Sequence, residues 1–191
     1  MRSQQPAERI LDEFLAASAR IGDRKALALL FRRWNGRLLA HAWRLLGDVE
    51  AAKDAVQEGW SEIIRGLPRL ADTRAFPAWA YRIVSRRCAR MIGKASRDRR
   101  LRDAIGREPE ADSYEASDAG LDAERIRGAL ASLPPEQRAA IALFHLEEMS
   151  VAEVAVALDV PAGTVKTRLM NARRRLRAAL EGEETCVIST G

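Results

Sequence analysis

The sequence has few of the residues that mark secreted, membrane-spanning or disulfide-stabilised proteins. Its two cysteines, Cys88 and Cys186, lack metal-ligand spacing, so a reduced chain is expected. No apolar run approaches the length of a membrane span, and residues 1–6 lack the apolar stretch of a signal peptide. Glycine and proline are sparse, and β-branched residues rarely alternate with polar ones. These features predict an all-helical, cytoplasmic chain without membrane insertion.

Charge is distributed unevenly along the chain, although its formal net charge is only +5. Residues 1–100 contain 21 Lys and Arg against 11 Asp and Glu, whereas residues 101–122 contain 2 against 7. Residues 123–191 balance at 9 against 9, yet six basic residues and no acid lie between positions 166 and 177. One strongly basic helix favours contact with a polyanion, and a solvated basic face is the alternative.

Apolar periodicity divides the chain into two helical segments. Stripes with helical spacing predict four helices before residue 102, with Asp48 as the N-cap of the third. The acidic stretch after them has no apolar period and is predicted to be a flexible linker. The predicted all-α organisation comprises a four-helix domain at 1–102, a linker at 103–122, a helix-turn-helix domain at 123–180 and a tail at 181–191.

The second segment contains the pattern of a helix-turn-helix. A short apolar stripe from Val151 to Leu158 is followed by a proline-containing turn and a longer helix. On that helix Val165, Leu169 and Ala172 share one face, and the polar side chains point the other way. A recognition helix needs this division, because it must pack on its scaffold while reaching base edges. A structural hairpin with a solvated arginine face is the alternative.

Three stretches of this segment resemble region 4 of the extracytoplasmic-function sigma factors of the sigma-70 family: residues 133–138, 149–155 and 161–168. The resemblance implies binding to the −35 promoter element. It places six side chains at the DNA: Lys166, Thr167, Met170 and Asn171 at the bases, and Arg173 and Arg174 nearer the backbone. Asn171 stands where the family commonly has Arg, so the preferred −35 sequence stays open.

The stretch at 48–58 resembles region 2.2 of the same family, which binds the clamp helices of the polymerase beta-prime subunit. Its polar side implies five contacts with core polymerase: Asp48, Glu50, Asp54, Gln57 and Glu58. From charge alone, an ordinary solvated acidic face would explain these residues equally well. Gly59 replaces a bulkier family residue and is expected to weaken its helix by about 0.5–1 kcal/mol.

The stretch at 76–83 resembles regions 2.3 and 2.4, which separate the strands of the −10 element. Aromatic rings can stack on unpaired bases while cations bind their phosphates. The resemblance implies six −10 contacts: Trp79, Tyr81, Arg82, Arg86, Arg87 and Arg90. The loop at 66–75 would border a pocket for a flipped base. The alternative makes Trp79 and Ile83 core residues. Arg86 and Arg90 stand where relatives commonly have Asn and Asp.

Together these patterns predict an alternative sigma factor that binds core RNA polymerase and promoter DNA and is held inactive by an anti-sigma factor. The alternative function is a conventional helix-turn-helix regulator that binds duplex DNA without polymerase. An enzyme is disfavoured, because His41, His145 and Cys88 show no catalytic or metal-ligand spacing. No catalytic residue, metal, cofactor or small-molecule substrate is therefore expected, and Cys88 is expected to be a small buried side chain.

Overall fold

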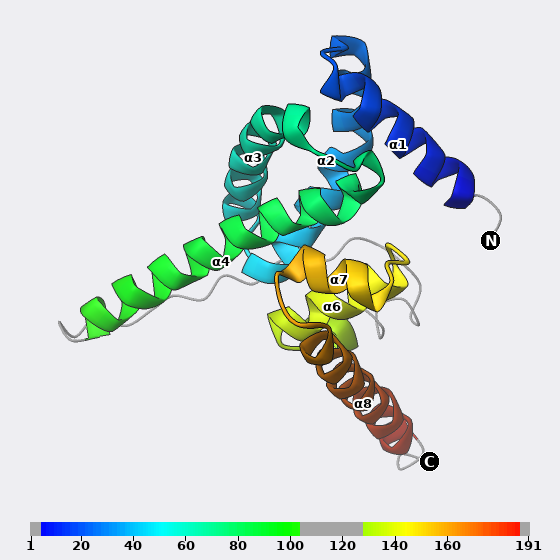
Figure 1. Ribbon diagram of the computed structural model, residues 1–191. Helices are drawn as coiled ribbons and strands as arrows, with labels where there is room; N and C mark the ends of the chain where they lie inside the picture. Colours follow the sequence, from blue (N-terminus) through cyan, green and yellow to red (C-terminus); the bar gives the residue numbers. More distant parts are fainter. Residues whose placement is uncertain (1–4, 104–127, 188–191) are drawn as a thin grey trace.

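The computed structural model describes residues 5–103 and 128–187, and every regular element within them is helical, which confirms the all-α prediction (Figure 1). Beyond its first residue, the predicted linker lies outside the described residues. The long helices of the N-terminal half are α1 (Gln5–Arg20), α2 (Arg24–Leu46), α3 (Val49–Gly66) and α4 (Phe76–Asp103). Two short 3-10 turns, Leu67–Arg69 and Thr73–Ala75, connect α3 to α4. The C-terminal half contains α6 (Pro135–His145), α7 (Val151–Leu158) and α8 (Ala162–Val187).

Caps fix the sharp turn between α2 and α3. α2 ends at Gly47, whose φ of 75° lies in the left-handed region that glycine adopts without a steric penalty. Asp48 follows at once and accepts a hydrogen bond from the backbone nitrogen of Ala51 at 2.6 Å. The predicted N-cap is therefore confirmed, and the two helices leave the turn side by side.

α2 forms the centre of the N-terminal half, because α1, α3 and α4 all pack against it. Trp34 of α2 is 2% exposed and meets Phe76 and Tyr81 edge-on, at centroid distances of 5.5 Å and 5.7 Å. Edge-to-face rings are a favourable arrangement beyond the area that they bury. This aromatic cluster anchors the start of α4 on α2.

Gly59 lies where α3 and α4 approach each other. A Cβ atom at this position would lie 3.0 Å from the Cγ2 atom of Val84 on α4. The missing side chain therefore allows α3 and α4 to pack closely, at a position where glycine lowers the helix propensity. The propensity cost was predictable from the residue type, whereas the packing reason depends on a contact between two helices.

The C-terminal half contains the predicted helix-turn-helix as α7, a turn and α8. Ser150 and Glu153 form a capping box at the start of α7, in which each side chain binds the other's backbone nitrogen. α7 ends at Asp159, which has a positive φ of 56°. α8 then continues to Val187, so the helix extends into the predicted tail. Glutamates after residue 180 favour helix, and residues 188–191 lie outside the described residues.

The two halves pack against each other, with α7 on α4 and α6 on α2. Figure 1 shows α6 and α7 beneath α4, while α8 extends away from the N-terminal half. Buried residues of both halves belong to one continuous apolar cluster. Within residues 5–103 and 128–187, no helix is long and apolar enough to cross a membrane.

Candidate polymerase and promoter surfaces

α3 has two different faces: its outer face carries acidic residues, and its other side is buried in the core. Ala52, Val56 and Trp60 are almost fully buried. The residues predicted to bind polymerase all lie on the opposite, solvent-facing side or at the cap: Asp48, Glu50, Asp54, Gln57 and Glu58. Glu50 also binds Lys53 at 2.6 Å, while its side chain keeps 80% of its surface exposed. α3 therefore presents accessible hydrogen-bond acceptors along one side.

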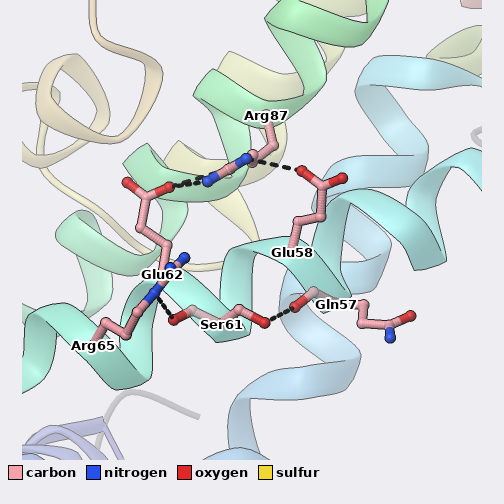
Figure 2. Close-up of polar contacts among 6 residues, drawn as sticks. All are labelled: Gln57, Glu58, Ser61, Glu62, Arg65 and Arg87. Carbon is pink, nitrogen blue, oxygen red and sulfur yellow. Dashed lines mark hydrogen bonds and ion pairs between the residues drawn. The ribbon is translucent and has the colours of Figure 1, made fainter.

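Arg87 of α4 binds the edge of this acidic face (Figure 2). Its Nη1 atom lies 2.8 Å from Oε2 of Glu58, and its Nε and Nη2 atoms lie 3.1 Å and 2.5 Å from Oε2 of Glu62. The hydrogen bond to Glu62 is the main cause that raises the pKa of Arg87. A residue predicted to bind DNA thus joins a residue predicted to bind polymerase. Glu62 was missed, although its spacing of four from Glu58 was the available signal.

The aromatic residues of α4 that were predicted to stack on DNA bases are less exposed than such stacking requires. Tyr81 is fully buried, and burial is the main cause that raises the pKa of its hydroxyl. Ile83 is 5% exposed, which confirms its interpretation as a core residue. Trp79 is half-buried, and its ring lies so near the end of α3 that a Cβ on Gly66 would approach it to 2.9 Å.

Three of the cations predicted to bind the −10 element lie at the surface of α4. Arg90 is exposed. Arg82 and Arg86 instead bind the carboxylate of Asp159, with nitrogen–oxygen distances of 2.8 Å and 2.9 Å. Hydrogen bonding to Arg86 is the main cause that lowers the pKa of Asp159. The structure thus brings two of the predicted −10 cations against the turn of the helix-turn-helix.

A small buried polar group lies between α2 and α4. His41 of α2 is fully buried, and its Nε2 atom lies 2.8 Å from Oγ of Ser85. Desolvation, with a smaller contribution from Arg44, lowers the pKa of His41 to about 3. Cys88 is also buried, as expected, and burial raises the pKa of its thiol to about 12. His41 and Cys88 are therefore both uncharged at neutral pH.

α8 has the divided surface that the sequence predicted. Val165, Leu169 and Ala172 are at most 4% exposed. The predicted −35 residues lie on the other faces: Lys166, Thr167, Met170, Arg173 and Arg174 are exposed, and Asn171 is half-buried. Thr167 donates a hydrogen bond to the carbonyl of Gly163 at 3.1 Å, which holds its hydroxyl near the start of the helix.

A groove of about 450 Å³ runs beside this surface, between α8 and the preceding helices. The ring of Phe144 forms part of its wall, and the Arg173 guanidinium lies 5.5 Å from the centre of this ring. Its lining comprises Phe144, Val151, Lys166, Leu169, Met170, Arg173, Arg174 and Arg177. The groove thus places cations beside the face of α8 that is open to solvent.

A helix-turn-helix with a cationic outer face, joined to a second helical unit with acidic and basic surfaces, defines a two-part DNA-binding transcription factor. Models of known families match both parts, as "Sigma-70 region 2" over residues 30–98 and "Sigma-70, region 4" over residues 123–176. The chain belongs to the extracytoplasmic-function sigma factors of the sigma-70 family, and it is an alternative sigma factor that directs transcription initiation.

Individual relatives agree with this assignment. The ECF RNA polymerase sigma factor SigM of Mycobacterium tuberculosis is 34% identical over 176 residues, which cover 91% of this chain and 86% of SigM. Among solved structures, the sigma factor RpoE of Bartonella quintana, in complex with the anti-sigma factor NepR, matches with a TM-score of 0.65 and 25% identity. That match covers 82% of this chain and 98% of RpoE. CnrH, in complex with the cytosolic domain of CnrY, matches with a TM-score of 0.60 and 28% identity over 90% of this chain and 98% of CnrH.

Proposed function

We propose that this sigma factor binds core RNA polymerase through α3 and promoter DNA through α4 and α8. The division of α8 carries the proposal. Its apolar residues Val165, Leu169 and Ala172 are buried against the preceding helices, while Lys166, Thr167 and Met170 are exposed on the opposite side. A helix anchored on one face and cationic on the other fits the major groove of duplex DNA.

At the −35 element, the residues of α8 divide by the groups that they can bind. Thr167, Met170 and Asn171 face base edges with hydrogen-bonding and apolar groups, and Lys166 joins them near the helix start. Backbone N–H groups at that start favour a phosphate oxygen. Arg173 and Arg174 bind the backbone of the duplex, which adds affinity without sequence preference.

At the −10 element, the cations of α4 neutralise the phosphates of the separated strand. Arg82, Arg86 and Arg90 are the principal contacts, and the exposed part of Trp79 stacks on a base. The burial of Tyr81 and the pairing of Arg87 with two glutamates favour supporting roles for these two residues. Tyr81 shapes α4 from beneath, and Arg87 fixes its angle to α3.

On the polymerase side, α3 offers Glu50, Asp54, Gln57 and Glu58 to the basic clamp helices of the beta-prime subunit. Their exposure and the burial of the opposite face support this assignment. Asp48 contributes chiefly as the cap that starts α3. Polymerase performs the chemistry, so the sigma factor itself acts without a catalytic step and works in the cytoplasm.

An anti-sigma factor is the further partner that we propose. RpoE of Bartonella quintana was solved with the anti-sigma factor NepR and CnrH with the cytosolic domain of CnrY, and both resemble this chain along most of its length. A partner that covers α3 or α8 would block polymerase or DNA.

Transcription in vitro tests the proposal. Core RNA polymerase is supplied with this protein and a library of promoter fragments, and the transcripts are sequenced. Sequence-specific initiation that depends on the protein is expected. A footprint on duplex DNA without polymerase, together with no specific initiation, would overturn the proposal in favour of a conventional regulator.

A further inference from the structure

The turn of the helix-turn-helix contacts the basic face of α4 through a single carboxylate. Oδ1 of Asp159 lies 2.8 Å from Nη2 of Arg82, and Oδ2 lies 2.9 Å from Nε of Arg86. One acid thus engages two cations that stand four positions apart on one helix face. They are two of the three cations that the proposed function assigns to the −10 phosphates.

The backbone around Asp159 fixes the position of this carboxylate. The residue terminates α7 in the left-handed conformation, and its backbone nitrogen binds the carbonyl groups of Ala155 and Val156. Asparagine and aspartate tolerate this conformation better than most other residues. The carboxylate is therefore presented by the end of a helix and does not depend on a freely moving loop.

Among the residues that the structure describes, two further ion pairs join the halves at other places. Arg9 of α1 lies 3.4 Å from Glu153 of α7, and Arg37 of α2 lies 3.8 Å from Glu147, which follows α6. In all three contacts the cation belongs to the N-terminal half and the acid to the C-terminal half. These acids of the C-terminal half thus face α1, α2 and α4, whereas the basic residues at 166–177 gather on α8.

We infer that this arrangement is a closed, self-inhibited state of the sigma factor, in which Asp159 occupies the α4 cations that would bind promoter phosphates. The inference rests on the proposed function of α4. A carboxylate and a phosphate oxygen bind the same guanidinium groups, so they compete directly. DNA must displace Asp159 before it can bind Arg82 and Arg86.

The contact shifts the equilibrium between the closed and open states towards the closed state, but it does not prevent opening. Arg82, Arg86 and Asp159 keep between 39% and 46% of their side-chain surfaces exposed, so water and salt screen the interaction. Ion pairs of this kind are individually weak, and packing of α7 on α4 and of α6 on α2 supplies the remaining stability of the closed state. Polymerase or DNA can therefore open it by binding the open state more tightly.

Closure acts selectively on one of the two DNA surfaces. Lys166, Thr167 and Met170 stay exposed on α8, and Met170 is 61% exposed. The closed state therefore occupies two of the three proposed −10 cations, Arg82 and Arg86, and leaves the proposed −35 residues accessible. This difference supplies an internal control, because binding of duplex and of single-stranded DNA can be compared in one protein.

The test uses the full chain with Asp159→Asn, which keeps the left-handed backbone and the shape of the side chain but removes the charge. Glu136→Gln is the matched control, because Glu136 lies on the same half but pairs within it, 3.9 Å from Arg168. Fluorescent labels at Ser61→Cys and Arg175→Cys, in a Cys186→Ser background, report the separation of the halves. Binding of a labelled single-stranded oligonucleotide of mixed sequence reports access to α4, and a mixed-sequence duplex reports access to α8.

With Asp159→Asn, the label distance is expected to lengthen and single-strand affinity to rise about three- to tenfold, while duplex affinity rises less. Glu136→Gln should leave the distance and the ratio of the two affinities as in the wild type. An unchanged distance in Asp159→Asn overturns the closed state. A longer distance without a gain in single-strand affinity overturns the inhibitory role. The transcription assay on the unaltered protein tests the proposed function separately.

Discussion

Arg87 and Glu62 join α4 to α3 through two nitrogen atoms of one guanidinium that converge on a single carboxylate oxygen. The third nitrogen of Arg87 binds Glu58, so this one side chain bridges two adjacent turns of α3 (Figure 2). A fork of this geometry requires arginine, since the lysine ammonium carries its charge at one point. Arg87 therefore links the helix that we assign to polymerase with the helix that we assign to the −10 element.

Arg87→Lys is expected to lower the free energy of unfolding by about 1 kcal/mol or less, because the pair is partly exposed. Combined with Glu62→Gln, it should show coupling of about 0.5–1 kcal/mol in a double-mutant cycle measured by urea denaturation. Arg65→Lys, on the same helix as Glu62 but outside the pair, is the control. Additive effects of Arg87→Lys and Glu62→Gln would contradict the role of Arg87 as a bridge.

Asp54→Arg should weaken binding to core polymerase by at least about tenfold, because it places a cation opposite a basic partner helix. Asp54 is exposed, so the circular dichroism spectrum and the melting temperature should stay close to those of the wild type. Glu13→Arg makes the same charge change on α1 and should bind polymerase normally. Equal polymerase affinity of the two variants would remove α3 from the proposed interface.

Asn171→Ala and Arg174→Ala should affect −35 binding in different ways. The asparagine change is expected to relax discrimination at one base pair by about 1–3 kcal/mol, because it removes contacts with a base edge. The arginine change should weaken all sequences alike and reduce the slope of log affinity against log salt by about one. Binding selections over a range of salt concentrations separate these effects, and identical profiles would refute the assignment of the two residues on α8.

Stability should fall as the pH falls below 6.5, because the unfolded chain protonates His41 there while the folded chain does not. Burial lowers the folded pKa of His41 to about 3, so the unfolded state binds the additional proton between these values. The expected loss is about 1.4 kcal/mol for each pH unit in that window. Denaturation at pH 7 and pH 5 should show this slope in the wild type and a smaller one in His41→Gln. Equal slopes would mean that His41 is accessible to protons in the folded protein.

Local patterns in the sequence were sufficient to predict the secondary structure that carries the proposed sites. The burial of Val165 and Leu169 opposite Lys166 follows from helical periodicity, because neighbouring turns of one helix need no distant information. Asp48 was predictable as a cap for the same reason. The outer faces of α3 and α8 could therefore be assigned from the order of the residues alone.

The contacts between the halves could not be predicted in this way. Asp159 meets Arg82 across a long stretch of intervening chain, and no local pattern specifies that pairing. The depth of Tyr81 has a related cause, because α4 is packed against α2, α3 and α7 and so has more than one buried side. Periodicity identifies a single buried stripe and fails for a helix that is covered on several sides.

The close approach at Gly59 has an evolutionary consequence. A Cβ atom at this position would lie 3.0 Å from the side chain of Val84, which would have to shift by a few tenths of an ångström, so the sizes of the two residues are coupled. A relative with a bulkier residue at the first position is expected to have a shifted or smaller side chain at the second, or a wider separation of the two helices. In the second case the proposed polymerase and promoter surfaces would shift relative to each other. Substitutions at positions 59 and 84 should therefore occur together in relatives. A chimera that exchanges only α3 or only α4 between relatives would combine two side chains whose sizes do not fit each other.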